Sequence, residues 1–167
     1  MEIHGQFVRD GNPAPGNKAG GITTLEEKSL GCIHKGGKSI INEVVDYAKP
    51  ISEKGLVIMD TPGNDMSSIA GMVAGGAQVV VFTTGRGSAA GHPLVPVIKI
   101  TGNRITYENM KDNIDVDASP VIYNSGSLSE LGDNLYEETI DVANGKMTKA
   151  EILDYRETSV ARLCNFT

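Results

Sequence analysis

The fold is decided by residues 56–82, which read LVIMDTPGNDMSSIAGMVAGGAQVVVF. The unbroken apolar runs at 56–59 and 79–82 are typical of strands that are covered on both faces, as in parallel sheets. Between them, the turn formers of residues 61–65 precede a segment, 66–74, of the right length for a short helix. Strand, turn, helix and strand in this order form a βαβ unit. The stretch therefore predicts an α/β protein with a small parallel sheet.

Toward the carboxyl end, the alternation of strands and helices continues. Residues 97–100 (VIKI) resemble the first two apolar runs, and residues 120–123 (PVIY) are predicted to form a further strand. Two helices are predicted to follow, at 127–143 and at 148–162.

Toward the amino end, residues 5–21 are dense in Gly, Pro and Asn, and we expect a loop there. Thr23 and Glu26 stand at capping-box spacing and predict a helix that runs to about residue 35. A second helix is predicted to begin near Ser39, because four apolar residues recur at helical spacing. These four are Ile41, Val44, Val45 and Ala48.

Length and composition predict one domain over residues 1–167. The chain has two cysteines, no apolar run near the roughly 20 residues that span a bilayer, and no signal-peptide pattern after Met1. We therefore expect a cytoplasmic protein without a membrane partner. The net charge is −6, and residues 107–157 carry four Lys/Arg against twelve Asp/Glu, so no basic stripe indicates a nucleic-acid partner.

Polar, glycine-rich loops follow three predicted strands, at 60–65, 83–88 and 101–103. In open α/β sheets the binding crevice lies beyond the carboxyl ends of the strands, so we expect these loops to lie at one edge of the sheet. Glycine permits close backbone approach, and Arg86 offers a planar fork that can hold a carboxylate with two hydrogen bonds. Together the loops predict a binding site for a small anion.

Simpler explanations exist for several of these residues. Residues 61–63 suit a tight turn, Asn64 suits a helix cap, and Glu26 already has a capping role. Glu27 and Lys28 have no such role and are therefore candidates for chemistry. The three histidines lack metal-binding spacing, and neither a P-loop nor a complete dinucleotide-binding motif is present.

A long block at residues 11–31, GNPAPGNKAGGITTLEEKSLG, resembles the signature of the altronate and galactarate dehydratases. MDTPGND at 59–65 resembles a second block of that family. FTTGRGS at 82–88, with Ile98–Ile100 and Asn103 after it, resembles a third.

A weaker resemblance continues through residues 110–118 and 144–149, so most of the chain is covered. One departure is HPL at 92–94, where many galactarate enzymes have CKP. This difference argues against an assignment specific to galactarate.

The resemblance implies dehydration of sugar acids such as altronate to 2-keto-3-deoxy acids, with Fe²⁺ or another divalent metal such as Mn²⁺. It also implies a Rossmann-like parallel sheet flanked by helices. Full-length members carry an amino-terminal and a middle region before this one. The chain is therefore expected to be the carboxy-terminal catalytic part of a larger enzyme, or a split subunit, and to act in a homo-oligomer.

Within this resemblance, Glu27 is a candidate base or carboxylate ligand for the metal, and Lys28 is a candidate acid or charge stabiliser. The candidate substrate-binding residues lie in the glycine-rich blocks and beside them. They are Asn17, Lys18, Thr61, Asn64, Thr84, Arg86, Lys99 and Asn103.

Two alternatives remain open at this point. One relative within the family removes sulfite from sulfolactate, so the chain could belong to a sulfolactate sulfo-lyase subunit. The chain could also be a non-catalytic domain or subunit that binds an acidic metabolite. Assaying dehydration after the preceding family regions are added separates a catalytic domain from a binding domain.

Overall fold

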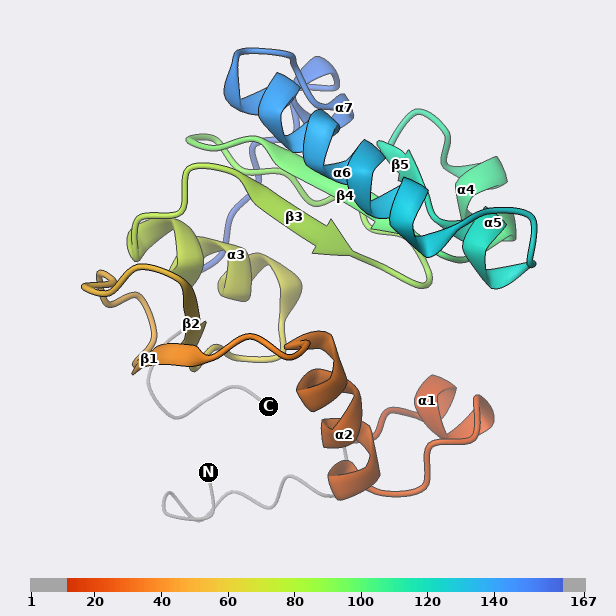
Figure 1. The fold of residues 1–167 in the computed structure, drawn as a ribbon, viewed down its shortest axis with the longest axis horizontal. Coiled ribbons are helices and arrows are strands. Elements are labelled where there is room, and N and C mark those ends of the chain that lie inside the picture. Colours follow the sequence, from red (N-terminus) through yellow and green to blue (C-terminus); the bar gives the residue numbers. More distant parts are fainter. Residues whose placement is uncertain (1–11, 161–167) are drawn as a thin grey trace.

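The computed structural model describes residues 12–160, apart from the side chain of Cys32, and it alternates helices with short strands (Figure 1). In chain order the elements are α1 (Pro15–Ala19), α2 (Leu25–Lys35), β1 (Ile41–Val45), β2 (Leu56–Met59), α3 (Asp65–Ala74), β3 (Val80–Thr83), β4 (Val97–Thr101), α4 (Arg104–Asn109), β5 (Val116–Asp117), α5 (Ser119–Ile122), α6 (Leu128–Ala143) and α7 (Lys149–Ile152).

The strands form two small parallel sheets. β1 pairs with β2, and a separate sheet has the order β3-β4-β5. In the larger sheet Val80 lies opposite Val97, and Ile100 lies opposite Val116. The α/β class and the parallel pairing are confirmed. The prediction of one sheet containing both 56–59 and 79–82 is wrong, because β2 and β3 belong to different sheets.

The core lies between α3 and the larger sheet. Ile69 of α3 packs with Val80, Ala90 and Val97 in one buried cluster. All five residues of β4, the central strand, are buried, as expected for a parallel sheet that is covered on both faces. Figure 1 shows α3 on one side of this sheet and α6 and α7 on the other.

The helix predicted from Ser39 is wrong, because residues 41–45 form strand β1. Ile41 lies opposite Leu56 and Val45 opposite Met59, so the segment is stabilised by pairing with β2. Ile and Val are stiff at χ1 and suit a pleated surface better than a helix. Residues four positions apart share one face of a helix and also one face of a strand, so the apolar pattern fitted both structures. Pairing with β2 selected the strand.

The strand predicted at 120–123 is also wrong, because this segment is helix α5. Pro120 lies in the first turn of α5, where a missing N–H and a fixed φ are tolerated. The third strand of the sheet instead comes earlier, at 116–117, and is only two residues long.

Other boundaries differ in smaller ways. The loop expected at 5–21 contains α1, and its part before residue 12 lies outside the described residues. The helix predicted at 148–162 is shorter in the structure, where α7 ends at Ile152. Residues 161 and 162 of the predicted helix lie outside the described residues. The sequence did not predict α4. Within residues 12–160, no helix combines the length and hydropathy needed to cross a membrane.

Candidate functional site

The loop after β3 is held in place by contacts on both of its sides. The hydroxyl of Thr84 accepts a hydrogen bond from the Gly87 N–H at 3.1 Å. The Thr106 hydroxyl of α4 donates to the Gly85 carbonyl at 2.9 Å. Gly87 has a φ of 90°, and a Cβ there would lie 3.1 Å from the Thr106 methyl carbon. The backbone that carries Arg86 is therefore fixed from within the loop and by α4.

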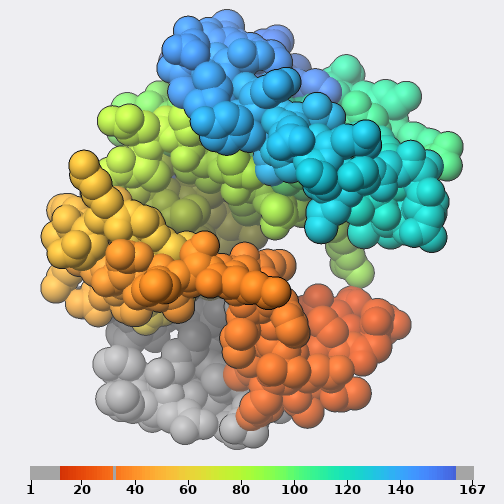
Figure 2. All heavy atoms as spheres, viewed as in Figure 1, coloured from red at the N-terminus to blue at the C-terminus, as the bar shows by residue number. Residues whose placement is uncertain are grey.

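The Arg86 side chain extends from this loop to α1, which belongs to the long amino-terminal block. A Cβ built on Gly16 would lie 2.8 Å from Cζ of Arg86, so glycine is needed for this close approach. Figure 2 shows atoms of the yellow-green segment around residues 80–90 extending toward the orange-red α1 region. Two family-like blocks, about 70 positions apart in sequence, thus meet at this point.

Lys28 lies in the same region and contacts the same block. Its Nζ donates to Oδ1 of Asn12 at 2.8 Å and to Oδ1 of Asn17 at 3.2 Å. Asn17 directly follows Gly16, the residue that Arg86 contacts. The geometry therefore brings the cations of Arg86 and Lys28 to neighbouring residues of one short helix.

Glu27 has the capping role that the sequence pattern assigned to Glu26. The Glu27 N–H donates to Oγ1 of Thr24 at 3.1 Å, and Oε2 of Glu27 accepts from the Thr23 N–H at 2.8 Å. The capping pair is thus Thr24 and Glu27, one residue later than predicted. The Thr23 hydroxyl, which donates at 2.5 Å, and then the Thr23 N–H lower the pKa of the exposed Glu27 carboxyl.

Three predicted substrate-binding residues hold loops or helix ends. Asn64 is the N-cap of α3 and accepts from the Ser67 N–H at 3.1 Å. Asn103 is the N-cap of α4 and accepts from the N–H groups of Ile105 and Thr106. Thr61 accepts from the Ser68 hydroxyl at 3.0 Å. Thr61 and Asn64 follow β2 of the smaller sheet, whereas Asn103 follows β4 of the larger one.

Lys99 lies in the core and not at an edge of the sheet. Its side chain has no exposed surface, and Nζ donates to the Ala90 carbonyl at 3.0 Å. Burial lowers the pKa of the Lys99 ammonium, the nearby Asp115 carboxylate opposes that shift, and Lys149 adds to it. In this structure the ammonium supports the segment that follows Arg86, and it does not open onto the surface where Arg86 lies.

Lys18 is exposed and lines a small surface cavity with Asn12 and Thr24. No group of three or more His, Cys, Asp or Glu side chains within residues 12–160 is placed to hold a metal ion. Glu27 alone is not a metal centre, because divalent cations bound by proteins take several ligands. The residues of this range therefore do not make up the metal site that the family resemblance implies.

Sequence reasoning missed Asn12 and Thr106, which hold Lys28 and the loop of Arg86. Asn12 lies within the long amino-terminal block, so its place in that block could have identified it. Thr106 carries no comparable signal, because only the fold brings α4 against residues 85–87.

The chain matches, over residues 1–165, the family described as D-galactarate/altronate dehydratase, C-terminal. It is 40% identical over 166 residues to an altronate dehydratase of Bacillus subtilis, covering 94% of this chain and 31% of the relative. The altronate dehydratase of Escherichia coli is 40% identical over 149 residues, which cover 89% of this chain and 30% of the relative. The β subunit of a (2R)-sulfolactate sulfo-lyase of Chromohalobacter salexigens is 39% identical over 157 residues, which cover 93% of this chain and 40% of the relative. The chain thus spans between about a third and two fifths of the length of these relatives.

Proposed function

Because the chain belongs to the D-galactarate/altronate dehydratase C-terminal family, we propose that it is the carboxy-terminal catalytic domain of a cytoplasmic sugar-acid dehydratase. The reaction is β-elimination of water from a sugar acid such as altronate, which gives a 2-keto-3-deoxy acid. Residues 1–167 act as one domain, joined to amino-terminal and middle regions in a longer chain or as a split subunit of a homo-oligomer.

The observation that supports this proposal most is the meeting of Arg86 with Gly16, beside the bonds from Lys28 to Asn12 and Asn17. A sugar acid carries an ionised carboxylate at neutral pH. A guanidinium binds a carboxylate with two parallel hydrogen bonds, and a nearby ammonium adds a second positive charge. In the proposal Arg86 holds the substrate carboxylate and Lys28 stabilises the negative charge that develops on it.

The elimination of water requires a base that removes one proton and an acid that donates one to the leaving hydroxyl. A base removes the proton from C2, and the resulting enediolate places a second negative charge on the carboxylate that Arg86 binds. The electron pair then forms the C2–C3 double bond, and the C3 hydroxyl is protonated and leaves as water. The enol then takes up a proton at C3 and loses the proton of its C2 hydroxyl, which gives the keto acid. Glu27 is the proposed base and Lys28 the proposed acid; Asn17, Lys18 and Thr84 are proposed to contact the substrate hydroxyls.

The proposed cofactor of the whole enzyme is Fe²⁺ or Mn²⁺. Within residues 12–160 only Glu27 is proposed as a ligand, and no complete donor set is present there. We therefore assign no step of the reaction to the metal.

The decisive experiment joins the chain to the preceding regions of an altronate dehydratase and assays altronate with Fe²⁺ under reducing conditions. We expect 2-keto-3-deoxy acid from the joined protein, and little from the 167-residue chain alone, because misplaced catalytic groups cost orders of magnitude. A joined protein that folds and binds altronate without turnover would contradict the catalytic role and support a non-catalytic binding domain.

A second candidate function is the elimination of sulfite from sulfolactate. It is favoured by the 39% identity to a sulfo-lyase β subunit, which is itself one chain of a larger assembly. Sulfolactate also carries a carboxylate next to C2, so Arg86 would hold it in the same way. Sulfite release from sulfolactate by the joined protein, without turnover of altronate or galactarate, would select this function.

A further inference from the structure

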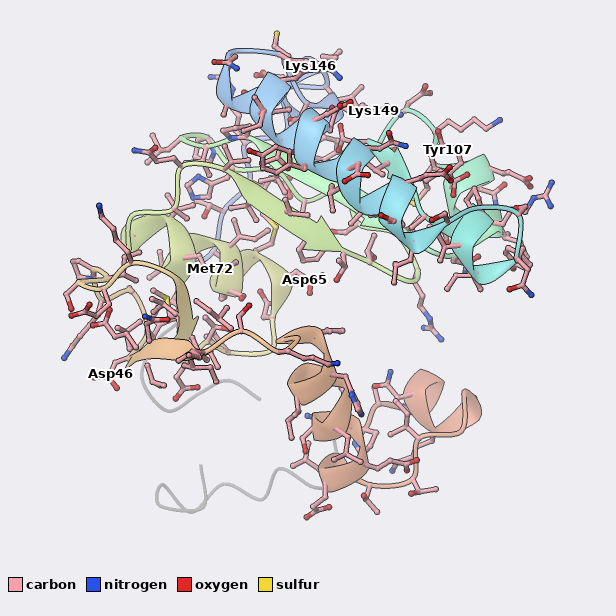
Figure 3. The ribbon with its side chains drawn as sticks, in the orientation of Figure 1. Asp46, Asp65, Met72, Tyr107, Lys146 and Lys149 are labelled. Carbon is pink, nitrogen blue, oxygen red and sulfur yellow. The ribbon has the colours of Figure 1, made fainter. Side chains whose placement is uncertain are left out.

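A cavity of about 300 Å³ lies beyond the carboxyl ends of β4 and β5, between α4 and α5. Six of its lining residues carry the argument: Arg104, Tyr107, Lys111, Asp117, Ser119 and Tyr123. Figure 3 labels Tyr107, whose side chain lies in the region of α4, β5 and α6. This edge of a parallel sheet is where α/β proteins bind ligands, and the volume suits a small molecule.

Helix α4 separates this cavity from the loop of Arg86. Thr106 and Met110 face that loop, because a Cβ on Gly87 would contact both of them. Arg104 and Glu108 line the cavity, and helical geometry places both about 160° around α4 from Thr106. The cavity is therefore a site of its own and not an extension of the Arg86 region.

Ser119 provides a buried polar group in this cavity. Its side chain is only 3% exposed, and its N–H donates to Oδ1 of Asp117 at 2.9 Å. Within residues 12–160, the Ser119 hydroxyl has no hydrogen-bond partner, although Ser119 lines the cavity. No buried side-chain nitrogen or oxygen among the described residues lacks a hydrogen-bond partner, so this unpaired hydroxyl is reached by solvent from the cavity and is open to a ligand.

The charges of the cavity fit a ligand with one negative end and several hydroxyl groups. Arg104 pairs with Glu108 at 3.1 Å, which leaves Lys111 as the cation that has no ion pair among the described residues lining the cavity. Asp117 is the second carboxylate, and its oxygens can accept hydrogen bonds from hydroxyl groups. Tyr123 offers apolar ring surface for the C–H groups of such a ligand, whereas Nζ of Lys149 lies over the Tyr107 ring, 5.9 Å from its centre.

We propose that the α4–α5 cavity binds a small carboxylic acid that carries several hydroxyl groups, at a site separate from Arg86. The ligand carboxylate pairs with Lys111. Its hydroxyl groups bind Asp117 and the Ser119 hydroxyl. This inference goes beyond the proposed function, because it stands on the cavity alone and does not require that the chain catalyses dehydration.

The test is a titration of the ¹⁵N-labelled 17.7 kDa chain with sodium D-gluconate, followed by amide chemical shifts. We expect saturable shifts at residues 104–125 that Arg86→Lys leaves unchanged. Lys111→Gln removes the exposed cation and should weaken this binding about tenfold, equivalent to about 1.4 kcal/mol. Ser119→Val should abolish it by filling the ligand position. Lys54→Gln, at a distant exposed lysine, is the matched control and should bind like the parent chain.

Ser119→Val could also unfold α5, and Lys111→Gln keeps the test decisive because that exposed side chain makes no hydrogen bond or ion pair within residues 12–160. Three results overturn the proposal: no saturable shift at residues 104–125, shifts that survive Lys111→Gln unchanged, or equal binding of glycine, which lacks hydroxyl groups. Shifts confined to residues 84–87 and lost in Arg86→Lys would support the Arg86 site alone and overturn the cavity site.

Discussion

The amino-terminal segment and the larger sheet are held in the structure in different ways. Over residues 12–40, which contain α1 and α2, Pro13 is the one buried residue among the described side chains. In β4, by contrast, every residue is buried, and Val97 and Ile98 have no exposed surface. The segment with the longest family-like block is therefore stabilised least by its own packing.

This difference separates the segment proposed to carry chemistry from the segment that carries stability. The polar side chain of Arg86 approaches this segment at Gly16, whereas the sheet buries apolar side chains. On α2, Ile33 is 69% exposed. We therefore expect residues 12–40 to contribute less to the stability of the fold than the sheet does, and substitutions in the two regions test this contrast.

The largest expected effect is on stability and is confined to the sheet. Ile98→Ala removes a fully buried side chain and should cost about 2–5 kcal/mol of unfolding free energy. Ile33→Ala, on α2, should change the unfolding free energy by less than about 0.5 kcal/mol. Urea unfolding of both variants, followed by circular dichroism, measures the difference. Equal losses would show that α2 is packed as firmly as β4.

The next effect is on catalysis, where the two regions meet. Arg86→Lys keeps the charge but loses the two-pronged geometry, so in the joined enzyme kcat/KM should fall about tenfold or more, at least about 1.4 kcal/mol. The melting temperature should hardly change. Arg104→Lys, on the far side of α4, is the matched control and should retain full kcat/KM. A lowered melting temperature with normal kinetics would assign Arg86 to structure instead.

A smaller effect concerns the buried cation of the sheet. Burial lowers the pKa of Lys99 below its ordinary value of 10.5, so the unfolded chain takes up this proton more readily than the folded one. Stability therefore rises with pH between the folded-state pKa and about 10.5. In Lys99→Met this part of the rise should be missing, and exposed Lys54→Met should keep it. Unfolding free energies from about pH 7 to about pH 10 check the sign.

The smallest effect is at the start of α2. Hydrogen bonds from Thr23 lower the pKa of the Glu27 carboxyl below 4.5. Their contribution to the stability of this helix end is therefore full above pH 4.5 and is lost as the pH falls through the folded-state pKa. Amide exchange over residues 25–31 should therefore quicken on acidification in the parent chain. Glu27→Gln should show little of this pH dependence, whereas Glu137→Gln on α6 should behave like the parent.

Much of the architecture could be predicted from local sequence. The runs at 56–59 and 97–100 are strands, and the segments after 64 and 127 are helices. The long block at 11–31 indicated the family, and the match over residues 1–165 confirms it. The strands and helices depend on apolar periodicity, on turn residues and on side-chain caps, all of which act within a few residues of sequence.

The tertiary structure alone decided the rest, because those outcomes depend on partners far away in the chain. Residues 41–45 are a strand because β2 lies beside them, and Lys99 is buried because helices lie on both faces of the sheet that contains β4 (Figure 1). The contact of Arg86 with Gly16 joins the loop after β3 to helix α1, and no local pattern relates the two. Local propensities set which elements can form, whereas pairing and burial between distant segments set which side chains meet and which are removed from water.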